Sequence, residues 1–308
     1  ANQNHLSSIN NLGMIYYEGI YIARDVERAI YYLTLAANQN HLSSINNLGM
    51  IYYEAKYIKS DEKKAIYYLT LAANQNIPNA QNYLGMIYYE GKYIIRDVNK
   101  AIHYFSLAAN QNFRNAQYNL GIIYCEGIYI QQDIRKAIQY FTLSANQCYP
   151  EAQFKLGCYY LNGFYLSKNM NKACYYLYLA AEQNVNEARF LLGIIYSKGE
   201  EIAKDMNKSI HYYKYASSLN HPKAKNNLAM IYLKEIGIEK NELKHKQYAI
   251  ELLKEAIKLN DPISMYNLAH IYFNDQNKND ENIIDLLIKS SRYFDLSIEL
   301  LAIIIINF

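Results

Sequence analysis

The stretch that decides the fold is NNLGMIYYEG, residues 10–19, because it returns almost unchanged as NNLGMIYYEA at residues 46–55. Its Leu-Gly step recurs every 36 residues, at Leu12, Leu48, Leu84, Leu120, Leu156 and Leu192. The step continues as Leu-Ala at Leu228 and Leu268, and a weaker copy of the stretch lies at residues 297–306. A period of this length is typical of helical repeat arrays. The sequence therefore predicts eight repeats followed by the first helix of a ninth.

Glycine and proline indicate that one backbone conformation is being repeated. Eleven of the chain's 12 glycines occupy two positions, one directly after the Leu and one six residues later. All 4 prolines stand six residues before the Leu. Proline is tolerated in the first turn of a helix, and glycine favours the left-handed residue that ends one. The pattern predicts a first helix that ends near Gly19, and Ala55, at the same place in the second repeat, should be slightly strained.

Each repeat is expected to form two helices. Ile9, Leu12, Gly13 and Tyr16 have the spacing of one helical face. After a short link, Asp25 is expected to cap a second helix, as are its copies Asp61, Asp97, Asp133 and Asp205. The apolar stripe of that helix is Val26, Ala29, Ile30, Leu33, Ala36 and Ala37, and Gly13 is expected beside the last two alanines. Because a single hairpin cannot bury its stripe, neighbouring hairpins must stack, which predicts an α-solenoid.

The repeat also matches a known pattern. The first copy carries Leu12, Gly13, Tyr16, Gly19, Asp25, Arg28, Ala29, Tyr32, Ala36 and Ala37. With these residues, and with six close copies, the chain resembles the Sel-one-like repeat (SLR), a relative of the tetratricopeptide repeat. It departs from that pattern where a second glycine is replaced by tyrosine, as at Tyr21 and Tyr57, and where a closing glycine is replaced by asparagine, as at Asn40. The resemblance implies an all-α, right-handed superhelical solenoid that acts as a scaffold or adaptor.

We predict a single array over residues 1–308, with regular repeats in 1–227 and divergent repeats plus a terminal helix in 228–308. The formal charge of +3 is too small to favour nucleic acid as a partner. None of the 4 cysteines forms a CxxC pair, so we expect no metal, no cofactor and a cytoplasmic, reducing location. A signal peptide in a longer gene would favour the ER lumen instead. No apolar run is long enough to span a membrane, and the chain begins within a repeat, which suggests a fragment.

The adjacent tyrosines of the opening stretch are expected to differ in role. Tyr16 lies on the apolar stripe and should pack in the core, whereas Tyr17 lies about 100° further round the helix, beside Asn10 and Met14. In tetratricopeptide-like folds that face lines a concave groove. The groove hypothesis names Asn10, Met14, Tyr17, Asn46, Tyr53, Asn82, Tyr89, Tyr118, Phe154 and Phe190 as partner-binding residues. The alternative is that these side chains fill the space between repeats and that AT-rich codons account for the many tyrosines.

Two further features have structural alternatives. A basic ladder begins the second helices, at Arg28, Lys64, Lys100, Lys136, Lys172 and Lys208, and is expected to pair with acids or face solvent rather than bind phosphate. The tail LLAIIIINF, residues 300–308, is expected to be a terminal packing helix, although it could also support a homodimer or begin a membrane anchor.

The function expected from the sequence is a non-catalytic scaffold that binds a protein or peptide along the groove of first helices. One alternative is an adaptor subunit of an ER-associated degradation ubiquitin-ligase complex, since some SLR relatives belong to such complexes. Another is a hydrolase, since some bacterial relatives have been described as binding β-lactams. The repeat places no nucleophile beside a partnered base, which disfavours the hydrolase.

Overall fold

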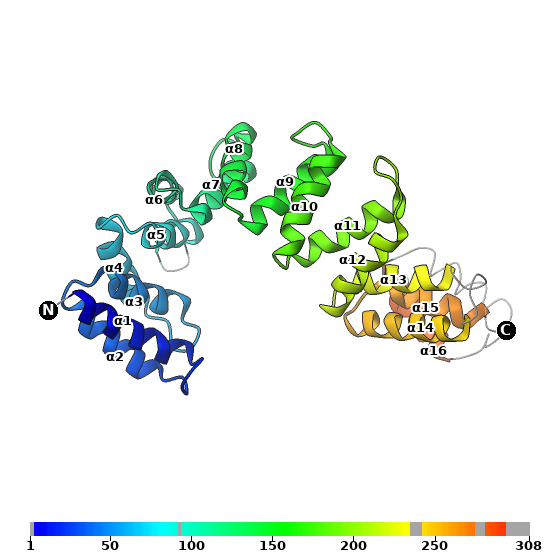
Figure 1. Ribbon diagram of the computed structural model, residues 1–308, viewed down its shortest axis with the longest axis horizontal. Coiled ribbons are helices and arrows are strands. Elements are labelled where there is room, and N and C mark those ends of the chain that lie inside the picture. Colours follow the sequence, from blue (N-terminus) through cyan, green and yellow to red (C-terminus); the bar gives the residue numbers. More distant parts are fainter. Residues whose placement is uncertain (1–2, 92–93, 235–241, 275–280, 294–308) are drawn as a thin grey trace. The chain divides into compact units, whose positions relative to one another are not determined.

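The computed structural model describes residues 3–91, 94–234, 242–274 and 281–293. Within these ranges the chain forms sixteen α-helices and no β-strand (Figure 1). The first helices of the repeats are α1 (Gln3–Glu18), α3 (Leu42–Glu54), α5 (Pro78–Glu90), α7 (Arg114–Glu126), α9 (Pro150–Asn162), α11 (Asn186–Lys198), α13 (Pro222–Lys234) and α15 (Pro262–Asn274). The second helices are α2 (Val26–Ala37), α4 (Glu62–Asn74), α6 (Val98–Asn110), α8 (Ile134–Asn146), α10 (Met170–Glu182), α12 (Met206–Ser218), α14 (Glu242–Lys258) and α16 (Glu281–Ser291). The predicted array of helical hairpins is confirmed.

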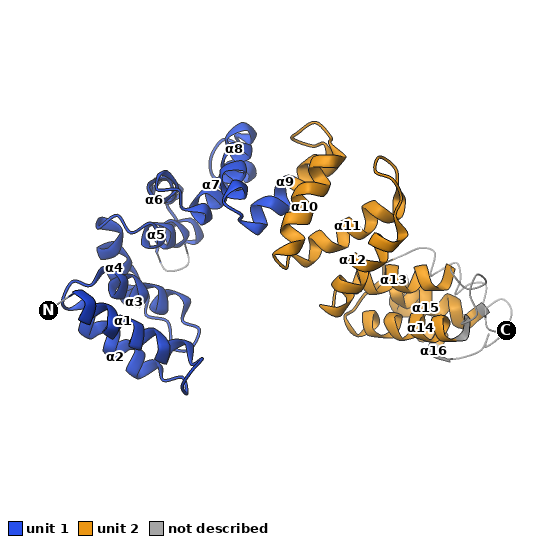
Figure 2. Cartoon of the chain, viewed as in Figure 1, with its two compact units in different colours: residues 1–156 blue, residues 157–308 orange. Residues whose placement is uncertain are grey.

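The chain divides into two compact units, residues 1–156 and residues 157–308 (Figure 2). Within each unit consecutive helices pack on one another, from α1 to α8 in the first unit and from α10 to α16 in the second. First helices of neighbouring repeats also touch, as α3 and α5 do in the first unit and α11 and α13 do in the second. Contacts restricted to neighbours are the property that defines a solenoid. The predicted change from regular to divergent repeats at residue 227 stays a prediction, and the predicted terminal helix at 297–306 lies outside the described residues.

The predicted helix ends are confirmed by backbone and capping geometry. The four prolines begin α5, α9, α13 and α15. Gly19 is left-handed at φ 68°, and Ala55 adopts the same conformation at φ 47° despite its side chain. Asp25 accepts a hydrogen bond from the Arg28 backbone N–H at 2.9 Å, the interaction expected of an N-cap. Asn40 ends the repeat in a left-handed conformation at φ 60°.

Close packing inside each hairpin depends on the glycine that follows the Leu. A Cβ atom added to Gly13 would lie 2.8 Å from the Leu33 side chain and 3.2 Å from the Ala29 carbonyl oxygen of α2. The sequence placed Gly13 beside Ala36 and Ala37, but its nearest neighbours lie one to two turns earlier in α2. The glycine therefore makes room for a large buried side chain, which is 0% exposed at Leu33, rather than for a contact between small residues.

Candidate functional site

The two adjacent tyrosines of the opening stretch have different surroundings. Tyr16 packs against the core cluster but is only half-buried. Its ring stacks on Tyr32 of α2, with 5.7 Å between centroids and 9° between planes. The Arg28 guanidinium lies 5.6 Å from the Tyr16 ring centre and pairs with the Asp25 carboxylate at 3.2 Å. Tyr16 therefore packs against the core, as predicted, but at its edge and beside a cation.

This arrangement recurs along both units. Stacked pairs with centroids 5.7–6.1 Å apart are Tyr52–Tyr68, Tyr88–Tyr104, Tyr124–Tyr140, Tyr160–Tyr176 and Tyr196–Tyr212. A lysine ammonium of the basic ladder lies 5.0–5.1 Å from the first ring of each pair. Four of these lysines also pair with their N-cap aspartate at 3.3–3.7 Å, namely Lys64, Lys100, Lys136 and Lys208. The prediction that the ladder pairs with acids is thus confirmed at these positions and at Arg28.

Tyr17 fills the space between the first two repeats. It is 7% exposed, and its ring meets Tyr57 of the next repeat edge-on at 5.6 Å. The Arg24 guanidinium lies 3.7 Å from the centre of the Tyr57 ring and donates to the backbone oxygens of Tyr17 and Glu18 at the end of α1. Burial, with a smaller contribution from Glu54, raises the pKa of the Tyr17 phenol. This packing corresponds to the space-filling alternative that the sequence left open.

Tyr89 is built into the first unit in the same way. Its ring meets Tyr129 edge-on at 6.3 Å, and the Arg96 guanidinium lies 4.5 Å from the Tyr129 ring centre. The half-buried Tyr89 hydroxyl also donates to Glu126 Oε2 of the next repeat at 2.7 Å. Burial and this hydrogen bond raise the pKa of Tyr89 to about 12. Tyr57 and Tyr129, two of the tyrosines that stand in place of the second glycine of the family pattern, are thus the ring partners of Tyr17 and Tyr89.

Tyr53, on the first helix between those of Tyr17 and Tyr89, also contacts the following repeat. Its ring meets Tyr83 edge-on at 5.2 Å, and its hydroxyl donates to Glu90 Oε1 at 3.1 Å. The Tyr83 hydroxyl donates to Glu54 Oε1 at 2.6 Å, and burial followed by this bond strongly raises the Tyr83 pKa. In the first unit, the row of Tyr17, Tyr53 and Tyr89 therefore crosses from each repeat to the next.

Two of the three asparagines of the predicted groove, Asn10 and Asn82, bond to the first helix of the following repeat. Asn10, Asn46 and Asn82 are all buried, with at most 9% exposure. Asn10 Oδ1 accepts from Ser44 Oγ and Asn47 Nδ2 of the following repeat, both at 3.0 Å. Asn82 Oδ1 accepts from Asn119 Nδ2 at 3.0 Å. These three residues lie beneath the surface that a ligand could touch.

The remaining predicted groove residues are all half-buried. Met14 packs against the core cluster of the first unit. The Tyr118 ring lies 5.6 Å from Phe141 and 5.1 Å from Tyr149, and burial raises its pKa to about 12. In the second unit Phe190 stacks on the His221 ring at 4.5 Å and lies 6.1 Å from Tyr213. Phe154 lies on α9, with part of its surface exposed.

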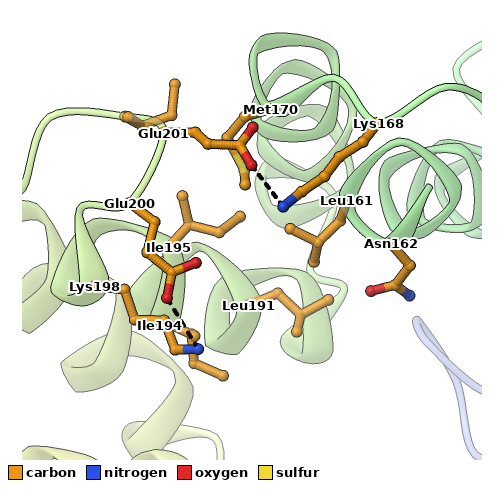
Figure 3. Close-up of a pocket in the computed structure, with 11 residues that line it drawn as sticks. Leu161, Asn162, Lys168, Met170, Leu191, Ile194, Ile195, Lys198, Glu200 and Glu201 are labelled. Carbon is orange, nitrogen blue, oxygen red and sulfur yellow. Dashed lines mark ion pairs between the residues drawn. The ribbon is translucent and has the colours of Figure 1, made fainter.

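A cleft opens in the second unit at the position that Tyr17 fills in the first. Leu161 of α9 occupies that position, 144 residues or four repeats after Tyr17. A cavity of about 220 Å³ lies beside it, lined by Leu191, Ile194 and Met170 among others (Figure 3). At the mouth, Lys168 Nζ pairs with Glu201 Oε1 at 2.6 Å, and Lys198 Nζ pairs with Glu200 Oε1 at 3.6 Å (Figure 3). Lys168 and Glu201 stand where Arg24 and Tyr57 stand in the first unit.

The next repeat carries a second cleft of the same construction. Its cavity of about 290 Å³ is lined by Ser197, Lys204, Met206, Asn227, Met230 and Lys234. Ser197, Lys204, Met206 and Lys234 each follow a residue of the first cleft by 36 positions. Across this cleft Asn227 Nδ2 donates to the Tyr213 hydroxyl at 3.1 Å. The two clefts are therefore one structural position repeated along α9, α11 and α13.

Sequence reasoning did not identify the lysines and methionines of these clefts. The signal was present, because the Tyr17 row changes to Leu161 and Ser197 in the second unit. Side chains shorter than tyrosine leave the space between repeats unfilled, but the resulting cavities depend on packing in three dimensions. The hypothesis named the large aromatics of the row, whereas the open volume lies where those aromatics are absent.

Across residues 3–91, 94–234, 242–274 and 281–293, no three His, Cys, Asp or Glu side chains lie together in a group that could hold a metal ion. In the same ranges no helix is long and apolar enough to cross a membrane.

Comparisons with known proteins bear on the whole array. A family model described as Sel1 repeat matches eight successive segments, residues 6–41, 42–77, 78–113, 114–147, 150–185, 186–221, 222–261 and 262–281. Among solved structures, the chain is similar to c5321, a protective antigen of uropathogenic Escherichia coli with an SLR fold, at 24% identity and a TM-score of 0.77. That match covers 96% of this chain, which spans only 63% of the antigen chain.

A Sel1 repeat protein from Oxalobacter formigenes is similar at 24% identity and a TM-score of 0.67, over 98% of this chain and 88% of that one. A search of curated protein sequences returns no match. At these identities, the two structures support the fold of the chain and nothing finer.

Proposed function

Since the chain belongs to the Sel1 repeat family, we propose that it is a non-catalytic scaffold that binds a protein or peptide along the face built from its first helices. Sel1 repeat proteins generally mediate protein–protein interaction. The proposal for this chain concerns where the partner binds and through which residues.

The observation that carries the proposal is the pair of clefts in the second unit. Both are lined by the first helices of consecutive repeats, with residues of the links and second helices, at one position of the repeat. Each combines apolar walls with charged groups, a composition that is common in ligand-binding pockets. Because α11 and α13 touch, a single extended segment could reach both clefts.

The residues first named from the sequence take two roles in this proposal. The half-buried side chains Tyr53, Tyr89, Tyr118, Phe154 and Phe190 keep part of their surface exposed and would contact the partner. The buried residues Asn10, Tyr17, Asn46 and Asn82, together with half-buried Met14, would hold the helices that present them. Aromatic side chains of the first kind are frequent among the residues that dominate interface energies.

The proposal is tested by filling the clefts. The double variant Leu161→Tyr/Ser197→Tyr copies the first unit's side chain into both positions, and we expect it to abolish capture of partners from a cell extract by the full chain. The thermal melt should stay close to that of the parent, since tyrosine already occupies this position in the first unit. Tyr31→Ala is the control, because Tyr31 lies on a second helix, is 63% exposed and should not affect capture. Undiminished capture by the double variant would contradict the proposed site.

Alanine variants of the half-buried residues Tyr89, Tyr118 and Phe154 would be a less sharp test of the proposal. Tyr89 donates a hydrogen bond to Glu126, and Tyr118 packs against two rings. Removing either side chain should therefore lower the melting temperature as well as partner capture. The cytoplasmic location stays a prediction. The dimer contact predicted for the apolar tail involves residues 300–308, which lie outside the described residues.

A further inference from the structure

The two clefts of the second unit differ in charge, although their backbone positions are equivalent. In the first cleft both lysines at the mouth have an acidic partner, Glu201 for Lys168 and Glu200 for Lys198. In the second cleft the equivalent lysines are Lys204 and Lys234. Both are exposed, and neither is paired with an acid among the residues that the structure describes.

The first cleft suits an uncharged apolar group. Leu161, Leu191 and Ile194 form part of its wall, and Figure 3 shows these side chains around the cavity with the two ion pairs at its edge. Because each cation already has a partner, a charged ligand group would have to compete with an existing ion pair. An aliphatic side chain would instead bury apolar surface on both sides of the contact.

The second cleft suits a carboxylate. Two ammonium groups, neither with an acidic partner among the described residues, lie on the lining of one cavity, whose walls also include Met206, Met230 and Ile231. Hydrogen bonds from lysine to a carboxylate are stronger than bonds between neutral groups, and they strengthen further where water is partly excluded. An acidic side chain could extend its methylene groups over the methionines and place its carboxylate between Lys204 and Lys234.

The spacing of the clefts determines how far apart the two ligand groups must lie. The clefts are one repeat apart. The first helices of the two repeats concerned, α11 and α13, are in contact. Packed helices have axes about 8–10 Å apart, and an extended chain advances about 3.3 Å per residue. Two anchoring side chains would therefore stand about three residues apart.

We propose that the second unit binds an extended peptide segment that places an apolar side chain in the Leu161 cleft and a carboxylate between Lys204 and Lys234, about three residues away. This inference rests on the proposed scaffold function and adds the chemistry of the partner to it. The charge pattern favours this occupant, because the lysines of the first cleft pair with glutamates, whereas those of the second have no acidic partner within the described part of the chain.

The experiment titrates the full chain, labelled with ¹³C at its methionine methyl groups, with synthetic peptides. The probes carry Leu-Ser-Ser-Glu or the reverse order Glu-Ser-Ser-Leu in a Gly-Ser background, and matched peptides carry Gln in place of Glu. Among the chain's 7 methionines, Met170 reports on the first cleft, and Met206 and Met230 report on the second. We expect at least one acidic peptide to shift all three signals and its Gln counterpart to bind roughly tenfold more weakly.

Variants of the protein provide the matched control. Lys204→Gln/Lys234→Gln should reduce affinity for the acidic peptide to that of the Gln peptide. Lys223→Gln, at the other end of α13 and on an exposed residue, should leave affinity unchanged. Equal binding of acidic and Gln peptides, or shifts that spare Met206 and Met230, would overturn the inference.

Two outcomes separate this inference from the function on which it rests. If no peptide binds while partner capture is still lost in Leu161→Tyr/Ser197→Tyr, the inference fails and the scaffold function stands. If the methionine shifts instead depend on protein concentration without peptide, a second copy of the chain occupies the clefts, and the peptide is ruled out as their occupant.

Discussion

The first and second units place different side chains at the same position between repeats. In the first unit Tyr17 meets Tyr57, and Arg24 lies over the Tyr57 ring. In the second unit Leu161 stands in place of Tyr17, Glu201 in place of Tyr57, and Lys168 in place of Arg24. The first unit has a cation–ring contact at 3.7 Å where the second has an ion pair at 2.6 Å. The space that Tyr17 fills in the first unit corresponds to a cavity of about 220 Å³ in the second.

This difference shows which part of a repeat is free to change. The contacts inside a hairpin are the same in both units, since a glycine faces a large buried side chain at Gly85 and at Gly193. The contacts between hairpins vary in volume and charge while the helix positions are kept. A repeat array can therefore acquire a binding site by shortening side chains between repeats, without altering the packing that makes it fold.

The largest expected effect tests the shared part of the comparison. A Cβ at Gly85 would lie 2.6 Å from the Phe105 ring, and one at Gly193 would lie 2.5 Å from the Tyr213 ring. Because both rings are buried, we expect Gly85→Val and Gly193→Val each to lower the free energy of unfolding by about 3 kcal/mol. Urea denaturation measures this, with exposed Gln139→Ala as the control. Sensitivity in only one unit would show that the hairpins are not equivalent.

A smaller effect is expected where the units differ. Tyr89→Leu gives the first unit the side chain found at position 161 of the second, and it removes the ring contact with Tyr129 and the bond to Glu126. We expect a loss of about 2 kcal/mol. Ser197→Tyr places the first unit's side chain at the equivalent position of the second unit and should not lower stability. Urea denaturation of the two variants measures both effects, with Tyr31→Leu at an exposed position as the control. A lower free energy of unfolding in Ser197→Tyr would mean that the second unit cannot accept the first unit's packing.

Relief of backbone strain should give a gain in the first unit. Ala55 is left-handed at φ 47°, where Gly19, Gly91 and Gly127 stand in other repeats. Ala55→Gly should raise the free energy of unfolding by about 1 kcal/mol, because glycine adopts this conformation without a steric penalty. Thermal and urea unfolding both report the change. An unchanged or lower stability would indicate that the flexibility of glycine in the unfolded chain outweighs the strain.

The smallest effect concerns alkaline pH. The pKa of Tyr89 is raised from 10.0 to about 12, so the folded state keeps the proton where the unfolded state releases it. The associated stability is complete below pH 10 and is lost as the pH rises from 10 through 12. Tyr89→Phe should therefore lose less stability than the parent between pH 9 and pH 11, by about 0.5 kcal/mol after allowance for solvent screening. An equal loss of stability with pH in the parent and in Tyr89→Phe would show that the Tyr89 phenol does not contribute to the pH dependence.

Much of the fold could be predicted because its signals are local. The positions of proline, glycine and aspartate predicted the helix ends, and Pro78, Gly19 and Asp25 occupy the places expected of them. These residues act through their own backbone dihedrals or through hydrogen bonds three residues away. A single repeat therefore contains the information, and eight copies make the pattern unmistakable.

The candidate site could be predicted only in part because its residues meet across repeats. Periodicity within one helix placed Tyr16 in the core and Tyr17 on an open face. In the structure Tyr17 is 7% exposed and Tyr16 is half-buried. A residue that lies outside the apolar stripe of its own hairpin can still be buried by the following hairpin. Tyr17 and Tyr57 are 40 residues apart, and no pattern inside α1 reports their contact.

The sequence by itself determined the period, the helix pairs and their ends, because each depends on residue types at fixed local spacing. The tertiary structure alone decided whether the space between repeats is filled, as at Tyr17, or open, as at Leu161 and Ser197. That outcome depends on the volumes and charges of side chains supplied by two neighbouring repeats at once. A cavity is a property of that pair, and for this reason the open clefts became apparent only when the hairpins were stacked.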